Sequence, residues 1–316
     1  MNDSDDIRRA VAVLRAGGLV AFPTETVYGL GADADNPAAL RRIFAAKGRP
    51  EGHPLIVHLG DAAAIVDWAA DVPETAMRLA ARFWPGPLTI VLRRSGRVRP
   101  EVTGGQDTVG LRVPAHPVAL ELLRGFGGGV AAPSANRFGR VSPTTAAHVR
   151  EDLGDAVDMI VDGGPCAVGI ESTIVDLSGP EPAILRPGGV PREDIEAELG
   201  GPVPLRVEGP VRAPGTLPSH YAPKARVVLA GVAEQAESLR ALAAAGRKAS
   251  VLVLPSSSRE AARGLYAALR DLDAQGCDAV VASVPAEEGL GLAVADRLRR
   301  AAGPRGDAAG MGEGGT

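Results

Sequence analysis

Residues 209–225 read Gly-Pro-Val-Arg-Ala-Pro-Gly-Thr-Leu-Pro-Ser-His-Tyr-Ala-Pro-Lys-Ala, and this stretch decides how the chain of 316 residues is divided. Its prolines favour an extended, semi-rigid connector rather than a helix or a strand. We therefore predict a first domain over residues 1–208, a Pro/Gly-rich linker over 209–226 and a second domain over 227–302. The Gly-rich tail, residues 303–316, is predicted to be disordered.

On the C-terminal side of the connector, short apolar runs alternate with helical patterns. Such alternation predicts a small, three-layer, Rossmann-like domain with a parallel sheet. The expected elements are strands at 227–230, 250–254 and 279–284, and helices at 234–245, 258–272 (capped by Ser258) and 290–302.

On the N-terminal side, a larger α/β domain is expected. Ser4 is predicted to cap a first helix that Gly17-Gly18 ends, and Asn36-Pro37 is predicted to start a second helix that stops near Gly48. Strands are expected at 19–22, 54–59, 88–92, 108–113, 130–132, 156–161 and 173–177.

Composition narrows the class of protein. Hydrophobic residues make up 45% of the chain and charged residues 23%, which is typical of a soluble globular protein, and the net charge of −4 argues against a large basic surface. Cys166 and Cys277 have neither metal-site nor disulfide spacing. An acidic N-terminus and the lack of a long apolar run complete the prediction of a cytoplasmic protein without membrane contact.

Two pairs of polar residues carry the chemistry. Lys47 and Arg49 are two residues apart, as are Ser134 and Asn136, so in extended segments each pair projects from one face. One pair supplies positive charge and the other neutral hydrogen-bonding groups, which together could hold a polyphosphate without a Walker loop. The competing interpretation of the basic pair is a solvated helix end.

Three further motifs are ambiguous. The spacing Gly29-x-Gly31-x-x-Ala34 approaches a dinucleotide fingerprint, but nearby aspartates oppose a pyrophosphate, so a glycine-rich turn is the default. Arg112, inside an apolar strand, lies either on a solvated face or in an anion-binding cleft. The basic run 93–99 favours a solvated hairpin over an RNA-contacting patch.

Taken together, the motifs resemble a known family. PTETVYGLG, KGRP followed by HPLIVH, VGLRVP, APSAN, GIESTIVD, LRPG and SHYAP occur in this order between Pro23 and Pro223. The set is similar to the long form of the YrdC-like family, the threonylcarbamoyl-AMP synthases with an added C-terminal domain. The resemblance implies a twisted, YrdC-like α/β catalytic domain followed by the Rossmann-like domain.

The resemblance also implies an activity. Members of the family are nucleotidyltransferases that make L-threonylcarbamoyladenylate from L-threonine, bicarbonate or CO2, and ATP with Mg²⁺, and release pyrophosphate. The product feeds the tRNA-modifying machinery that forms N6-threonylcarbamoyladenosine at position 37 of tRNAs reading codons that start with A. Direct tRNA binding, metal ligands and oligomeric state stay open.

Site residues follow by carrying the family's motifs onto matching positions. Lys47 and Arg49 are the candidate catalytic residues, and Lys47 and Asn136 are placed near the phosphates. His53 stands where many relatives carry Asn, and the connector is a candidate lid that brings His220 or Tyr221 to the nucleotide. The residues expected around L-threonine are Thr26, His58, Arg112, the Ala132 backbone and Ser172; those expected around ATP are Arg49, His53, Thr108, Ser134, Asn136, Ser142, Arg186 and Tyr221.

Two other functions are kept as alternatives. One is an RNA-binding factor of translation or ribosome assembly that uses the same cleft. The other is a carbamoyl-adenylate enzyme related to the carbamoyltransferases of hydrogenase maturation, although their acylphosphatase and zinc-binding regions are not recognised here.

Overall fold

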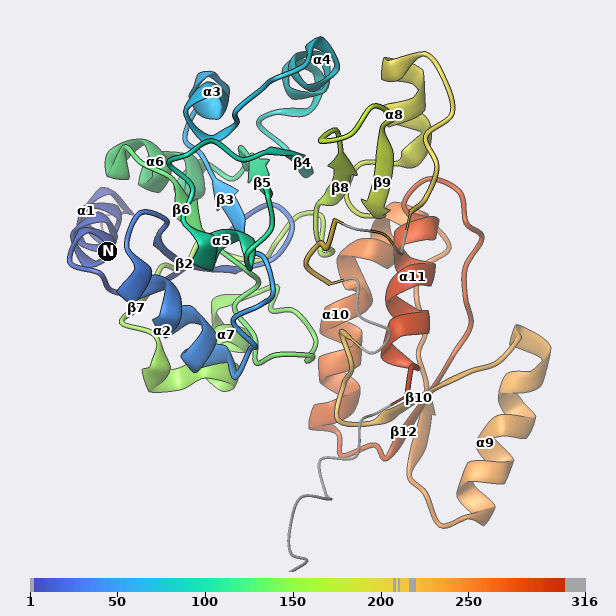
Figure 1. The fold of residues 1–316 in the computed structure, drawn as a ribbon. Coiled ribbons are helices and arrows are strands. Elements are labelled where there is room, and N and C mark those ends of the chain that lie inside the picture. The colour runs from blue at the N-terminus through green and yellow to red at the C-terminus, as the bar shows by residue number, and fades with distance from the viewer. Residues whose placement is uncertain (1–2, 207–208, 210, 216–219, 305–316) are drawn as a thin grey trace, which may run out of the picture.

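The computed structural model describes residues 3–206, 209, 211–215 and 220–304. Within these residues it contains one nine-stranded sheet and one three-stranded sheet, in two domains that pack side by side (Figure 1). The tail that was predicted to be disordered lies almost wholly outside the described residues. No helix within the described ranges is long and apolar enough to cross a membrane.

The large sheet forms the N-terminal domain and confirms the predicted α/β class. Its strand order is β7-β1-β2-β6-β3-β5-β4-β8-β9, with both parallel and antiparallel neighbours. The elements of this domain are α1 (Asp3–Arg15), β1 (Val20–Phe22), β2 (Gly29–Asp33), α2 (Pro37–Lys47), β3 (Ile56–His58), η1 (Ala62–Ala64), α3 (Ile65–Trp68), α4 (Glu74–Phe83), β4 (Leu88–Arg93), α5 (Pro100–Thr103), β5 (Thr108–Arg112), α6 (Pro117–Phe126), β6 (Val130–Ala131), α7 (Ala146–Leu153), η2 (Gly154–Ala156), β7 (Met159–Ile160), β8 (Thr173–Asp176), β9 (Ala183–Arg186) and α8 (Arg192–Leu199).

The small sheet forms the C-terminal domain and is wholly parallel, as predicted, with the order β10-β12-β11. Helix α9 packs against β11 and β12, whereas α10 and α11 pack together on the side that faces the N-terminal domain (Figure 1). The elements are β10 (Arg226–Leu229), η3 (Val232–Glu234), α9 (Gln235–Ala244), β11 (Ala249–Val251), α10 (Ser258–Ala274), β12 (Ala279–Ala282) and α11 (Gly291–Ala301).

Helix α2 begins and ends where its capping residues predict. The Asn36 side chain accepts hydrogen bonds from the amides of Ala38 and Ala39, and Gly48 closes the helix in the left-handed conformation, with φ 62°. Lys47 is therefore the last helical residue, and Arg49 follows a left-handed turn. The expectation that these two side chains project together from an extended segment was wrong, because the turn at Gly48 separates their directions.

Strand β2 was not predicted, since its glycines were interpreted as a turn. In the structure, β2 pairs with β1 and β6 in the middle of the sheet. A Cβ at Gly31 would lie 2.8 Å from side-chain carbons of both Phe22 and Val130. The glycine makes room for two neighbouring side chains of the sheet and forms part of a strand, so the dinucleotide fingerprint has no structural basis.

Some predicted helix boundaries also need correction. Ser257, not Ser258, is the N-cap of α10, and its Oγ accepts from the amide of Glu260. Helix α1 begins at Asp3, so Ser4 lies within the helix rather than at its cap. Local hydrogen bonding decides at which residue a helix begins, and a sequence pattern does not distinguish between adjacent residues.

Candidate active site

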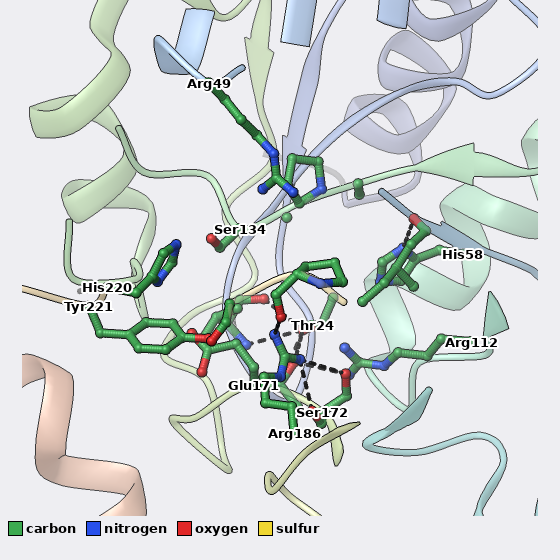
Figure 2. Close-up of a pocket in the computed structure, with 18 residues that line it drawn as sticks. Thr24, Arg49, His58, Arg112, Ser134, Glu171, Ser172, Arg186, His220 and Tyr221 are labelled. Atoms are coloured by element: carbon green, nitrogen blue, oxygen red, sulfur yellow. Dashed lines mark hydrogen bonds between the residues drawn. The ribbon is translucent and has the colours of Figure 1, made fainter. Parts of the chain in front are cut away.

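A pocket that is partly open to solvent lies between the central strands of the large sheet and the connector (Figure 2). His58 and Arg112 lie on one side of it, and His220 and Tyr221 on the opposite side. It is lined by Thr24, Thr26, Val27, Gly29, Arg49, Ile56, His58, Arg112, Ala132, Pro133, Ser134, Glu171, Ser172, Arg186, Pro214, Gly215, His220 and Tyr221.

Arg112 is buried and held in one orientation. The parallel register of β3 and β5 places it directly beside His58. Its Nη2 donates to Glu25 Oε1 at 2.6 Å and to Thr26 Oγ1 at 2.9 Å, and its Nε donates to the Gly86 carbonyl at 3.3 Å. These bonds use three of the five N–H groups of the guanidinium, so further donors are available to a carboxylate or another anion in the pocket.

His58 is neutral at ordinary pH. Burial, reinforced by the positive charge of Arg112, lowers the pKa of His58 to about 3. Its Nδ1 lies 3.3 Å from the Ile56 carbonyl, and its ring makes an edge contact with Phe22. The imidazole therefore offers hydrogen bonding and shape to a ligand, but no charge.

Hydroxyl groups cover the floor of the pocket. Thr24 Oγ1 lies 2.8 Å from Thr26 Oγ1 and donates to the Val27 carbonyl. Ser172 Oγ lies 2.8 Å from the hydroxyl of Thr89 on β4, the strand paired with β8. Each hydroxyl is fixed by its neighbour before any ligand binds.

Two further arginines reach the pocket from separate elements. Arg49 Nη2 donates to the Pro54 carbonyl at 2.8 Å, and burial lowers the pKa of Arg49 to about 10. Arg186, on β9, donates to the Ser172 carbonyl at 2.8 Å and to the Pro214 carbonyl at 2.9 Å. Both Nε atoms are buried and have no hydrogen-bond partner in the structure. Such unpaired cationic donors are suited to an anionic ligand.

Lys47 and Asn136, which were expected near phosphates, do not line the pocket. The amine of Lys47 donates to the backbone carbonyls of Ser134, at 2.5 Å, and of Asn136. The Asn136 amide in turn donates to the carbonyls of Arg137 and Arg140. Burial and the charge of Arg49 lower the pKa of Lys47 well below its usual range. Lys47 fixes the loop that presents Ser134 to the pocket.

Three other predicted ATP contacts lie at the edges. Ser142 is buried behind the pocket wall, where its Oγ donates to Glu171 Oε1 at 2.6 Å. Thr108 lines a small neighbouring cavity, and His53 makes an edge contact with Phe138 at 5.3 Å between ring centroids. The remaining predicted site residues line the pocket itself: Thr26, Arg49, His58, Arg112, Ala132, Ser134, Ser172, Arg186 and Tyr221.

The candidate lid lies against the pocket. Pro214, Gly215, His220 and Tyr221 border it, although the residues between 215 and 220 are outside the described ranges. Tyr221 adopts a positive φ of 60°, which is rare for a residue with a side chain. The connector is therefore part of the pocket wall; its movement as a lid stays a prediction.

Two carboxylates at the pocket were missed from the sequence. Glu25 pairs with Arg112, which lines the pocket, and accepts from the Ala115 amide. Glu171 accepts hydrogen bonds from the side chains of Ser142, Tyr266 and Arg297. The signal that could have found them is their position inside the motifs PTETVYG and GIEST, each beside a hydroxyl residue that was chosen.

The described residues contain no group of three or more His, Cys, Asp or Glu side chains arranged to hold a metal. Glu171, which lines the pocket, and Glu25, which lies behind Arg112, are both bound by protein donors. This donor set does not fit a metal cage made by the protein alone.

Two arginines of the basic run at 93–99 contact acidic or aromatic side chains. Arg97 pairs with Asp35 at 2.7 Å and lies over the Trp68 ring, and Arg94 lies 3.6 Å from Asp107. These contacts agree with a solvated hairpin and give no support to an RNA-contacting patch.

The fold and the arginine-lined pocket define a two-domain α/β protein of a recognisable class. Residues 12–188 match the Sua5, YciO and YrdC family model, described as telomere recombination, and residues 190–303 match the model of the threonylcarbamoyl-AMP synthase C-terminal domain. The threonylcarbamoyl-AMP synthase of Pyrococcus abyssi is 44% identical over 324 residues, covering 95% of this chain and 94% of that protein. The synthase of Bacillus subtilis is 42% identical and covers 95% and 93%.

A solved structure agrees with these sequence matches. The crystal structure of P. abyssi Sua5 complexed with L-threonine aligns with a TM-score of 0.91 at 42% identity, over 96% of this chain and 95% of that one. The chain belongs to the threonylcarbamoyl-AMP synthase family, in the form that carries a C-terminal domain.

Proposed function

We propose that this protein joins L-threonine, CO2 or bicarbonate, and ATP into L-threonylcarbamoyladenylate and releases pyrophosphate, as a nucleotidyltransferase. The observation that carries the proposal is the pocket, in which one arginine is held beside a neutral histidine and hydroxyls while two others reach it from different elements. Such a pocket suits a ligand with a carboxylate at one end and phosphates at the other. The name of the relatives, and the relative solved with L-threonine, support the same reaction.

We assign the part of the pocket beside Arg112 to L-threonine and call it the threonine half. The remaining N–H donors of Arg112 would bind the substrate carboxylate, while Glu25 and Thr26 hold the guanidinium in place. His58, Ser172 and the Ala132 backbone complete this half. The neutral imidazole of His58 adds no positive charge that would compete with Arg112 for the carboxylate.

The ATP half is assigned to Arg49, Ser134 and Arg186, with Ser142 and Tyr221 supporting it. His53, Thr108 and Asn136 lie outside the pocket wall and keep only a proposed indirect part. Lys47 is proposed to act by holding the Ser134 loop, because its amine is bound to two carbonyls of that loop.

The chemistry is an addition followed by a displacement. The neutral amine of threonine attacks the carbon of CO2 and loses a proton, which gives a carbamate. A carbamate oxygen then bonds to the α-phosphorus of ATP as the bond from that phosphorus to the β-phosphate oxygen breaks, so pyrophosphate leaves. Catalysis of this kind rests on positioning and on neutralising phosphate charge, which Arg49 and Arg186 can supply.

Mg²⁺ is proposed to enter with the nucleotide. Magnesium commonly keeps several waters and binds through substrate phosphates rather than a protein cage, and when bound it would neutralise phosphate charge. No step is assigned to a protein-held metal, since Glu171 in the pocket wall and Glu25 behind Arg112 are already bound by protein donors.

The product is proposed to serve tRNA modification in the cytoplasm. A mixed anhydride of a carbamate and a phosphate is an activated acyl donor, so a second enzyme must transfer the threonylcarbamoyl group to an amine. The proposed acceptor is N6 of adenosine 37 in tRNAs that read codons starting with A, and the transfer needs a separate tRNA-binding machinery.

The test is pyrophosphate release with ATP, L-threonine and bicarbonate together, and then with each one omitted. We expect release only with all three, together with a product of the mass of threonylcarbamoyladenylate. In the same assay Arg49→Ala should lower turnover by roughly 10²–10³-fold, whereas Arg41→Ala, an exposed residue of α2 that pairs with Glu101, should not. Threonine-independent release, or no release alongside tight tRNA binding, would refute the synthase.

A further inference from the structure

Glu171 lines the pocket, yet its carboxylate is held largely from the other domain. Tyr266 of α10 donates to it at 2.8 and 3.0 Å, and Nε of Arg297, on α11, donates at 2.8 Å. The third donor is Ser142 Oγ, at 2.6 Å. The C-terminal domain thus reaches the pocket wall with two side chains.

The same two side chains hold the connector residue of the pocket. The guanidinium carbon of Arg297 lies 4.7 Å from the centroid of the Tyr221 ring, and the Tyr221 and Tyr266 rings stack at 5.9 Å. Arg297 also donates to the Pro187 carbonyl at 3.0 Å and to Asp296 at 2.6 Å, and it is 1% exposed. These contacts hold the Arg297 side chain in one orientation.

The charge of the buried Glu171 carboxylate is compensated by neighbouring arginines. Burial disfavours the charged form of Glu171, but the charges of Arg297 and Arg186 outweigh it and hold the pKa of Glu171 at about 2. An uncompensated carboxylate in this wall would repel a triphosphate. The titratable or charged groups that interact with Glu171 are Arg297 on α11, Tyr266 on α10, Arg186 on β9, and His220 and Tyr221 on the connector. Asp296 pairs with Arg297 at 2.6 Å.

We propose that Arg297 and Tyr266 are positioning residues for the ATP half of the pocket: they neutralise Glu171 and hold Ser142 and Tyr221 in place. This rests on the proposed function, because it takes ATP as the ligand of that half. The proposal gives the C-terminal domain a part in nucleotide binding that acts through Glu171, Ser142 and Tyr221, since neither Arg297 nor Tyr266 lines the pocket.

The experiment measures KM for ATP and for L-threonine in Arg297→Gln. We expect KM for ATP to rise about tenfold, because a buried charge has lost its partner, and KM for threonine to change by less than about twofold, because the Arg112 side is separate. The matched control is Arg299→Gln, on the same helix, whose partner Glu287 is on the surface. Equal rises in both KM values would overturn the proposal.

The pH dependence of KM for ATP shows whether Arg297 acts by compensating the charge of Glu171 or only by supporting the pocket wall mechanically. Without Arg297 the pKa of Glu171 should rise, because its largest compensating charge is lost. More of the carboxylate should then be protonated, and the repulsion weaker, at pH 6 than at pH 8.5. The KM for ATP of the variant, divided by that of the unaltered protein, should therefore be smaller at pH 6 than at pH 8.5. A ratio independent of pH would overturn the proposal.

The double variant Glu171→Gln/Arg297→Gln removes both charges and should bring KM for ATP back to within about threefold of the unaltered protein. Tyr266→Phe keeps the ring stacked on Tyr221, loses only the hydroxyl, and should raise KM for ATP in the same direction. If Arg297→Gln does not fold, as judged by circular dichroism, these two variants carry the test, and unchanged KM values in Tyr266→Phe would overturn the proposal. An inactive unaltered protein would instead refute the proposed function.

Discussion

Burial determines the protonation state of the two histidines at the pocket. Desolvation is the largest cause that lowers the pKa of His58 and of His220, each to about 3, and neighbouring cations add to it. Nδ1 of His220 is buried without a hydrogen-bond partner in the structure, while its ring makes edge contacts with Tyr221 and Phe138. Both rings are therefore neutral near pH 7.

Acid should destabilise the protein through these histidines. In the unfolded chain a histidine has a pKa near 6.5, so the unfolded state binds more protons than the folded state once the pH falls below that value. The free energy of unfolding is therefore unaffected by these histidines above about pH 6.5, and it decreases as the pH falls from 6.5 towards 3. Between pH 6 and 5, His58→Gln should lose about 1 kcal/mol less free energy of unfolding than the unaltered protein.

Urea denaturation followed by fluorescence of Trp68 and Trp84 measures this difference. His53→Gln is the control, since His53 is only partly buried and should give a smaller change in the pH slope. The same slope in His58→Gln as in the unaltered protein would show that His58 is charged in the folded state.

At the scale of the element, the end of α2 determines what reaches the pocket. Gly48 closes the helix at a positive φ of 62°, so the chain turns between Lys47, which binds the Ser134 loop, and Arg49, which lines the pocket. A residue with a Cβ is strained in this conformation.

Gly48→Ala should lower the free energy of unfolding by about 1 kcal/mol. A Cβ at this position meets no atom within 4 Å, so the loss would come from backbone strain alone. Gly48→Asn should lose less, because Asn tolerates the left-handed conformation better. Urea denaturation midpoints of the two variants compare them, and an equal loss in both would mean that strain at φ is not the cause.

At the scale of the whole molecule, the two domains share a buried interior. One apolar cluster joins Val141 and Ile170 of the N-terminal domain to Leu265 and Leu269 of α10. Arg270 of α10 also pairs with Asp152 at 2.5 Å and donates to the Val141 carbonyl. Separation of the domains would expose both the apolar surface and the buried charges, including Glu171 and Arg297.

We therefore expect the domains to unfold in one transition. Both tryptophans are in the N-terminal domain, whereas circular dichroism at 222 nm reports helices of both domains. The two probes should give the same denaturation midpoint, and calorimetry should show a single peak. Separate midpoints would indicate that the shared interior contributes little stability.

Local patterns were sufficient for much of the fold. The caps Asn36 and Gly48 placed α2, and the alternation after residue 226 predicted the small parallel sheet, because caps and runs of apolar residues act on their own neighbourhood. The motifs, matched in order, indicated most of the residues that line the pocket. Strand β2 was missed because Gly31 is explained only by its close approach to Phe22 and Val130 on adjacent strands.

The sequence by itself determined the two-domain α/β organisation, the family, and the set of arginines and hydroxyls at the pocket. Only the tertiary structure decided that Lys47 supports a loop while Arg49 lines the pocket, and that Glu171 is neutralised by Arg297, 126 residues away. The physical reason is that charge compensation depends on distance in space, and the packing of two domains sets that distance.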